Sequence, residues 1–97
     1  MLVFDYDKAM AQVRELRQIA GEMARTREQK MCEAIDCVRG SWKGLTGQLF
    51  VLKCADLEAR IDKEVRNIRM IADDLEIKAN MVAQQESEAS MMITARP

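Results

Sequence analysis

The sequence predicts an all-α protein, with two long helices joined by a short turn into an antiparallel hairpin. The only proline is the last residue, Pro97, so proline interrupts neither helix. Apolar residues recur at steps of three and four on both sides of the chain's midpoint, which is the spacing of one helical face. Three of the four glycines fall within residues 40–47, and this cluster marks the break between the helices.

The first helix is predicted at about residues 7–39. Asp5 and Asp7 offer a capping side chain and negative charge, both of which favour a helix start. The apolar stripe consists of Met10, Val13, Leu16, Ala20, Met23, Met31, Ile35 and Val38. Arg27 takes the remaining place in the stripe. Either its aliphatic stem covers the seam while the guanidinium reaches water, or it fixes the register of the partner.

The turn is predicted at residues 40–46, around Trp42-Lys43-Gly44. Gly40 suits the position just after a helix, where glycine adopts a left-handed backbone most easily. We expect the Trp42 ring to be partly buried at the end of the hairpin or shared with a partner. Gly44 would then permit close approach beside it.

The second helix is predicted at about residues 47–88. Its stripe consists of Phe50, Cys54, Leu57, Ile61, Val65, Ile68, Ala72, Leu75, Ala79 and Val82. Such a sustained heptad indicates left-handed coiled packing against a long partner. Its exposed surface carries acid-before-base pairs four residues apart, a stabilising arrangement, at Asp56–Arg60, Asp62–Arg66 and Asp74–Lys78. Residues 1–90 then form one hairpin domain, followed by a flexible tail at 91–97.

Some apolar residues lie off the single internal face that a two-helix hairpin possesses. They define a candidate partner interface, formed by Leu45, Leu49, Met70, Ile77 and Met81. A second hairpin packed against them would complete a four-helix bundle. The alternative is a scatter of exposed apolar residues on a monomer.

Composition argues against several function classes. Lys and Arg number 15 and Asp and Glu 16, so the chain lacks the positive field of a nucleic-acid binder. There is no histidine, and three cysteines without a C-x-x-C motif do not make a zinc site. Those cysteines are free thiols, or Cys37 and Cys54 form a disulfide across the hairpin. We expect no cofactor, no enzymatic activity and no stable membrane insertion, since the longest apolar runs are short.

Trp42-Lys43-Gly44 at the midpoint between two helices of similar length, with Phe50 two turns later, resembles the WXG family. These proteins are small helical hairpins of the bacterial type VII secretion system, and the resemblance covers about residues 4–88. It implies pairing as a homodimer or heterodimer in a four-helix bundle. It also implies a cytoplasmic protein that engages a membrane-embedded secretion ATPase, as a substrate or as the partner of a larger secreted effector.

Members of this family commonly carry a signal, Tyr-x-x-x-Asp/Glu, after the second helix. The corresponding stretch here runs from Val82 to Glu86, so the acid is kept and the aromatic residue is replaced by Val82. The resemblance then implies that a partner supplies the signal, or that the chain is a chaperone-like targeting factor for an effector or toxin. A self-sufficient secreted homodimer and an unrelated structural coiled-coil subunit are the alternative hypotheses.

Overall fold

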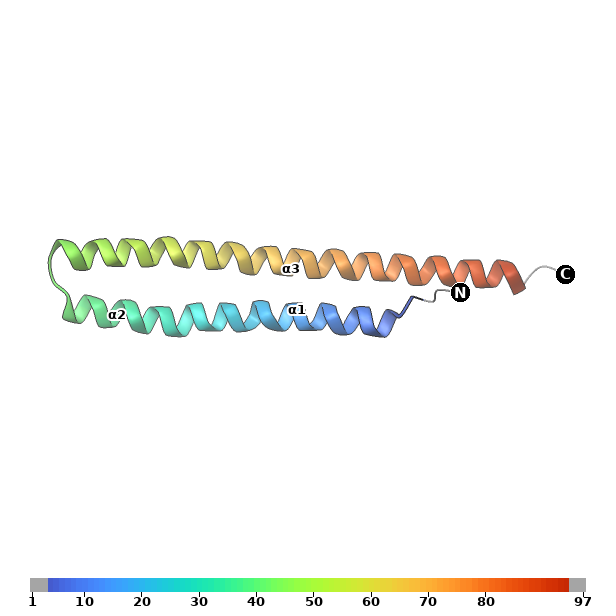
Figure 1. The fold of residues 1–97 in the computed structure, drawn as a ribbon, viewed down its shortest axis with the longest axis horizontal. Coiled ribbons are helices and arrows are strands. Elements are labelled where there is room, and N and C mark those ends of the chain that lie inside the picture. The colour runs from blue at the N-terminus through green and yellow to red at the C-terminus, as the bar shows by residue number, and fades with distance from the viewer. Residues whose placement is uncertain (1–3, 95–97) are drawn as a thin grey trace.

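The computed structural model describes residues 4–94, and within them the chain is helical apart from its start and one short turn. The elements are α1 (Tyr6–Thr26), a π-helical segment (Arg27–Met31), α2 (Cys32–Ser41) and α3 (Leu45–Thr94). The all-α prediction is confirmed. As Figure 1 shows, α1 and α2 follow one another in line and run antiparallel to α3. The result is a rod of 83 × 16 × 16 Å, two helices wide.

The start of α1 follows the predicted capping. The Asp5 side chain accepts a hydrogen bond from the Lys8 backbone N–H at 2.9 Å, which satisfies one of the free donors of the first turn. Asp7 adds negative charge in that turn. The helix therefore begins at Tyr6, one residue before the predicted start.

A narrow seam of small residues holds the helices together. The buried apolar residues of the helical segment from α1 to α2 are Val13, Ala20 and Ile35. Those of α3 are Val65, Ala72 and Ala79. The α3 residues are spaced by seven, as the predicted heptad requires. Because alanine has a short side chain, the helix backbones can approach closely along this seam. The seam is also narrow, so it leaves most of each helix surface in water.

The open end of the rod is closed by two polar contacts from the N-terminal segment to α3. The Phe4 backbone N–H donates to Glu86 at 2.8 Å, and the Tyr6 hydroxyl donates to Asn80 Oδ1 at 2.7 Å. These contacts place Phe4 and Tyr6 beside the C-terminal part of α3. α3 continues beyond them to Thr94, so its bounds exceed the predicted end at residue 88 and include the first part of the predicted tail. Residues 95–97 lie outside the described part of the chain.

The turn is shorter than predicted. The Trp42 N–H still donates to the Val38 carbonyl at 2.8 Å, so helical bonding passes through Gly40 and α2 ends only at Ser41. Trp42 then becomes extended, with φ −111° and ψ 111°. The left-handed glycine is Gly44, with φ 89°, and not Gly40 as expected. Since α3 starts at Leu45, three residues reverse the chain.

The π-helical segment corrects the phase of the seam. Ala20 and Ile35 are both buried, but they are one residue further apart than two heptads, and Ala34 is exposed. A continuous α-helix would turn Ala34 toward α3 instead of Ile35. A π-helical turn absorbs one extra residue, and the segment Arg27–Met31 lies between the two buried positions. The single predicted helix at 7–39 is therefore interrupted for a packing reason.

Deleting Gln29, an exposed residue of this segment, should restore a regular heptad from Val13 to the present Ile35. We expect helicity to be retained and the melting temperature to stay level or rise. The matched control is deletion of the exposed Gln18 in α1, which rotates Val13 by about 100° off the seam and should lower the melting temperature. Thermal unfolding followed by circular dichroism measures both. Equal losses in the two deletions would exclude the phase-correcting role.

Candidate partner interface

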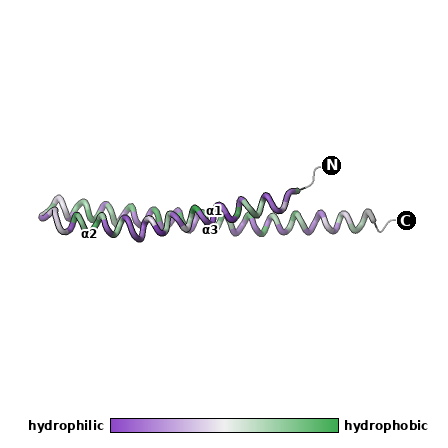
Figure 2. The backbone as a smooth tube through the Cα atoms, turned by 90° about the horizontal axis from the view of Figure 1, so that it is seen from below, coloured by the Kyte–Doolittle hydropathy of each residue, from purple (hydrophilic) through white to green (hydrophobic). Residues whose placement is uncertain are grey.

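The outer side of α3 exposes a group of large apolar side chains far from the turn. This distal patch consists of Met70, Ile71, Ile77 and Met81, of which Met70 is 66% exposed and Ile77 58%. Among the described residues, all but three of the exposed large apolar side chains lie on α3; the exceptions are Tyr6, Ile19 and Trp42. Figure 2 shows the same asymmetry, with hydrophobic residues recurring along α3 and a mostly hydrophilic α1.

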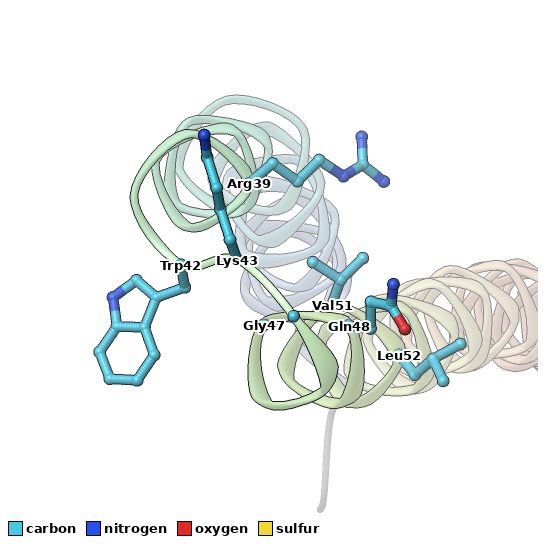
Figure 3. A pocket seen from close by; sticks show the side chains of 8 residues that line it. Arg39, Trp42, Lys43, Gly47, Gln48, Val51 and Leu52 are labelled. Atoms are coloured by element: carbon cyan, nitrogen blue, oxygen red, sulfur yellow. The ribbon is translucent and has the colours of Figure 1, made fainter.

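A second apolar surface lies beside the turn. This turn groove is lined by Val38, Trp42, Thr46, Leu49, Phe50 and Lys53. Trp42 is 60% exposed and its ring points outward from the helix pair (Figure 3), and the residue also contributes to the neighbouring hollow lined by Arg39, Gln48 and Val51. It therefore does not plug the end of the rod. The chain's own residues cover Trp42 only in part, and its sharing with a partner stays a prediction.

The turn geometry that projects Trp42 outward depends on two glycines. Gly44 provides the left-handed backbone, and Gly47 is buried against the Trp42 backbone in the first turn of α3. The predicted close approach beside Trp42 is thus made at Gly47, while a Cβ on Gly44 would meet open space. Leu45, the first residue of α3, is exposed next to this turn.

The two apolar surfaces share one side of α3. Leu49, Met70 and Ile77 are separated by multiples of seven residues, as are Phe50 and Ile71, so each set lies on one line along a coiled helix. Leu49 and Met70 are about 32 Å apart along the axis. Charged residues between them include Asp56, Lys63 and Glu64. The five predicted interface residues are therefore all exposed, but they belong to two ends of one long face.

The structure places Val82 and Glu86 on successive turns of α3. Val82 helps to line a shallow hollow with Phe4, Ala9 and Leu75, between α3 and the start of α1. Glu86 is half-buried and accepts the hydrogen bond from the Phe4 backbone. The two residues that resemble an export signal are thus held against the chain's own N-terminal segment.

Cross-helix ion pairs fix the alignment of the helices. Arg27 Nη2 lies 3.2 Å from Glu58 Oε2, and Arg27 Nε lies 3.1 Å from Asp62 Oδ1. Asp62 therefore pairs across the rod and not with Arg66, which corrects one of the three predicted pairs. Asp56–Arg60, at 3.2 Å, and Asp74–Lys78, at 2.8 Å, form as predicted.

Arg17 makes a second bridge between the helices. It donates to Glu76 and, at 2.9 Å, to Asp73. The hydrogen bonds to Glu76 and then to Asp73 raise the pKa of Arg17 above its usual value, so the guanidinium stays charged. These carboxylates are occupied by structural contacts with the chain's own cations.

Other side chains of the described part add no further site. Cys32, Cys37 and Cys54 are free thiols, the first two exposed. No group of three or more metal-ligating Cys, Asp or Glu side chains occurs within the described residues. In the same range, no helix has both the length and the apolar character required to cross a bilayer.

The sequence predicts only part of the turn groove. It places Leu49 in the interface but Phe50 in the internal seam, whereas the structure leaves Phe50 49% exposed. Ile71 was missed, although its spacing of 21 residues from Phe50 places both on one line. No protein-family model, no curated protein and no solved structure matches this chain.

Proposed function

We propose that the chain is a non-enzymatic adaptor that binds a helical partner along the outer side of α3, in the manner of WXG proteins. In this role it delivers a secreted effector or toxin to a type VII secretion machine. The observation that carries the proposal is the concentration of exposed large apolar residues on α3 and the turn, with only Tyr6 and Ile19 elsewhere in the described part of the chain. The midpoint Trp42-Lys43-Gly44 turn supports the family part of the proposal.

The exposed area supports the need for a partner. The chain exposes 7873 Å² for a mass of 11.1 kDa. A compact monomer of that mass exposes roughly 5,700 Å², so the excess is about 2,200 Å². Stable protein complexes bury about 1,200–2,000 Å² in total, or roughly 600–1,000 Å² on each partner, so one partner of standard size would remove part of this excess. A helical hairpin lying against α3 would cover the turn groove and the distal patch together and complete a four-helix bundle.

The partner is a different chain in this proposal, because Val82 lacks the aromatic ring of a self-sufficient signal and Glu86 is engaged by Phe4. Light scattering on the purified protein tests this point. We expect a monomer, or a poorly soluble species that an effector's helical domain rescues. A clean dimer would favour the secreted homodimer instead, and a stable dimer from an organism without type VII genes would favour a structural coiled-coil subunit.

Met70→Glu and Ile77→Glu should weaken assembly while leaving the helix pair intact, because both side chains are exposed and lie on the proposed interface. Placing one charge in a buried interface should reduce partner affinity by at least tenfold, or about 1.4 kcal/mol. The measurements are the mass of the complex and the circular dichroism of the free protein. Ala34→Glu, on the exposed surface of α2, is the matched control and should leave the mass unchanged.

An unaltered mass for Met70→Glu and Ile77→Glu would remove the outer side of α3 from consideration as the interface. Loss of helicity in the free variants would instead indicate that these side chains support the helix pair itself.

A further inference from the structure

The turn groove differs from the distal patch in charge, and this difference indicates what binds there. Residues 37–55 contain three cations, Arg39, Lys43 and Lys53, and neither Asp nor Glu. Lys53 lines the groove, while Arg39 and Lys43 line the hollow on the other side of the same turn. None of the three forms an ion pair with any residue of the described chain. The turn therefore combines exposed apolar side chains with uncompensated positive charge.

We infer that the turn groove binds an acidic amphipathic helix of the partner, with apolar residues on Trp42, Leu49 and Phe50 and carboxylates toward Lys53, attracted also by the positive charge that Arg39 and Lys43 add across the turn. The inference rests on the proposed function for the existence of a helical partner, and it adds the chemistry and the docking end of that partner. Charge complementarity of this kind sets the orientation and the association rate of a complex more than its final affinity.

The shape of the surface favours a helix as the occupant. The groove lies along the side of the rod, because its lining comes from α2, the turn and the first three turns of α3. Thr46, Leu49, Phe50 and Lys53 follow steps of three, one and three and so share one face of α3. A helix laid alongside α3 would contact this row over its length and would reach toward the distal patch.

A second copy of this chain is a poor match for the groove. Its acidic end is the distal part of α3, where Asp73 and Glu76 are paired with Arg17 and Asp74 is paired with Lys78. Glu86 accepts from Phe4, and Glu88 accepts from Gln84. These carboxylates are therefore already engaged within their own chain. We therefore favour a different chain as the source of the complementary acids.

Trp42 provides the measurement, since it is the only tryptophan and its ring is exposed in the groove. The probe is a synthetic amphipathic peptide of about 20 residues, long enough to form a helix, with Leu on one face and Glu on the other. We expect a blue shift of Trp42 emission on titration, weakened by added salt. The same peptide with Lys in place of Glu should bind at least tenfold more weakly.

Arg39→Glu with Lys53→Glu should reduce affinity for the acidic peptide on the order of tenfold, because it reverses one charge in the groove and one charge across the turn. Arg14→Glu with Lys30→Glu changes the net charge equally on the exposed surface of the first helix and should leave affinity within about twofold. Circular dichroism verifies folding of both double variants. If the Arg39→Glu/Lys53→Glu variant fails to fold, the comparison of the acidic and basic peptides on the unmodified protein still tests the inference.

Three results would overturn the inference. One is equal binding of the acidic and basic peptides. Another is a blue shift caused by raising the protein concentration alone, which would assign the groove to a second copy. The third is a shift with anionic phospholipid vesicles but with neither peptide. None of these variants alters Met70 or Ile77, so the mass of the partner complex tests the proposed function separately.

Discussion

Gly47→Ala should destabilise the protein by about 1–3 kcal/mol, because the added methyl group has no room in the native turn. A Cβ at this position would overlap the Trp42 carbonyl oxygen and would lie 3.1 Å from the Trp42 carbonyl carbon. Both obstacles belong to the backbone, so no side-chain rotation can relieve them. The turn would have to open, and α2 would move relative to α3.

Gly40→Ala is the matched comparison, and its effect should have the opposite sign. Gly40 is helical and exposed near the end of α2, and a Cβ there has no heavy atom within 4 Å. Replacing a helical glycine by alanine stabilises by roughly 0.5–1 kcal/mol. Denaturant unfolding of the two variants gives the comparison directly. Equal and small effects would show that Gly47 is not a packing constraint.

The same pair of glycines explains what the sequence could and could not predict about the turn. The cluster located the reversal, because glycines gather where backbone freedom is needed. The cluster did not show which glycine adopts the left-handed backbone and which one packs against Trp42. Gly40, Gly44 and Gly47 have similar sequence surroundings, yet Gly40 lies exposed near the end of α2, Gly44 is left-handed, and Gly47 is buried against Trp42 in the first turn of α3. That assignment depends on how far α2 continues, which the hydrogen bond from Trp42 to Val38 decides.

The exposed apolar residues of the proposed interface were predictable from periodicity in the distal part of α3 and less so near the turn. Met70, Ile77 and Met81 lie off the heptad seam, and the structure leaves all three exposed. Phe50 and Leu57 also fit a step of three or four from seam residues, but they face outward. Because the seam is built from Val65, Ala72 and Ala79, it is too narrow to bury neighbouring large side chains. Residue spacing alone does not reveal the width of a seam.

The spacing of the apolar stripe contains a signal for the π-helical segment. From Met23 the stripe runs through Arg27, Met31 and Ile35 in consecutive steps of four, whereas a heptad alternates three and four. Three successive steps of four therefore span one residue more than the heptad pattern does. The extra residue indicates that the helix changes its rotational phase between Met23 and Ile35. The π-helical segment Arg27–Met31 lies inside that interval.

Arg27→Leu should destabilise the helix pair by about 1.5–3 kcal/mol, the value of a hydrogen-bonded charged group in a partly desolvated site. The Arg27 side chain is 28% exposed and its partner Glu58 15%, so removing the cation leaves a shielded carboxylate without a partner. The Nε–H of Arg27 is buried and lacks hydrogen-bond geometry to Asp62, although the two atoms lie within ion-pair distance. Thermal or denaturant unfolding measures the loss. Arg60→Ala, which removes an exposed pair with Asp56, should change stability by less than about 0.5 kcal/mol.

The double variant Arg27→Leu with Glu58→Leu separates two roles for this cluster. If Arg27 mainly offsets the burial of Glu58, the apolar pair should recover most of the stability lost in the single variant, since hydrophobic replacements of buried ion pairs are often neutral or better. If Arg27 also fixes the register, the recovered protein should show more than one helix alignment. A disulfide-trapping experiment detects this, with Cys32, Cys37 and Cys54 replaced by serine, one cysteine introduced at Ala20 and others introduced along α3. A single crosslinked product from the stable double variant would leave Arg27 with an electrostatic role alone, and the small-residue seam would then be sufficient to align the helices.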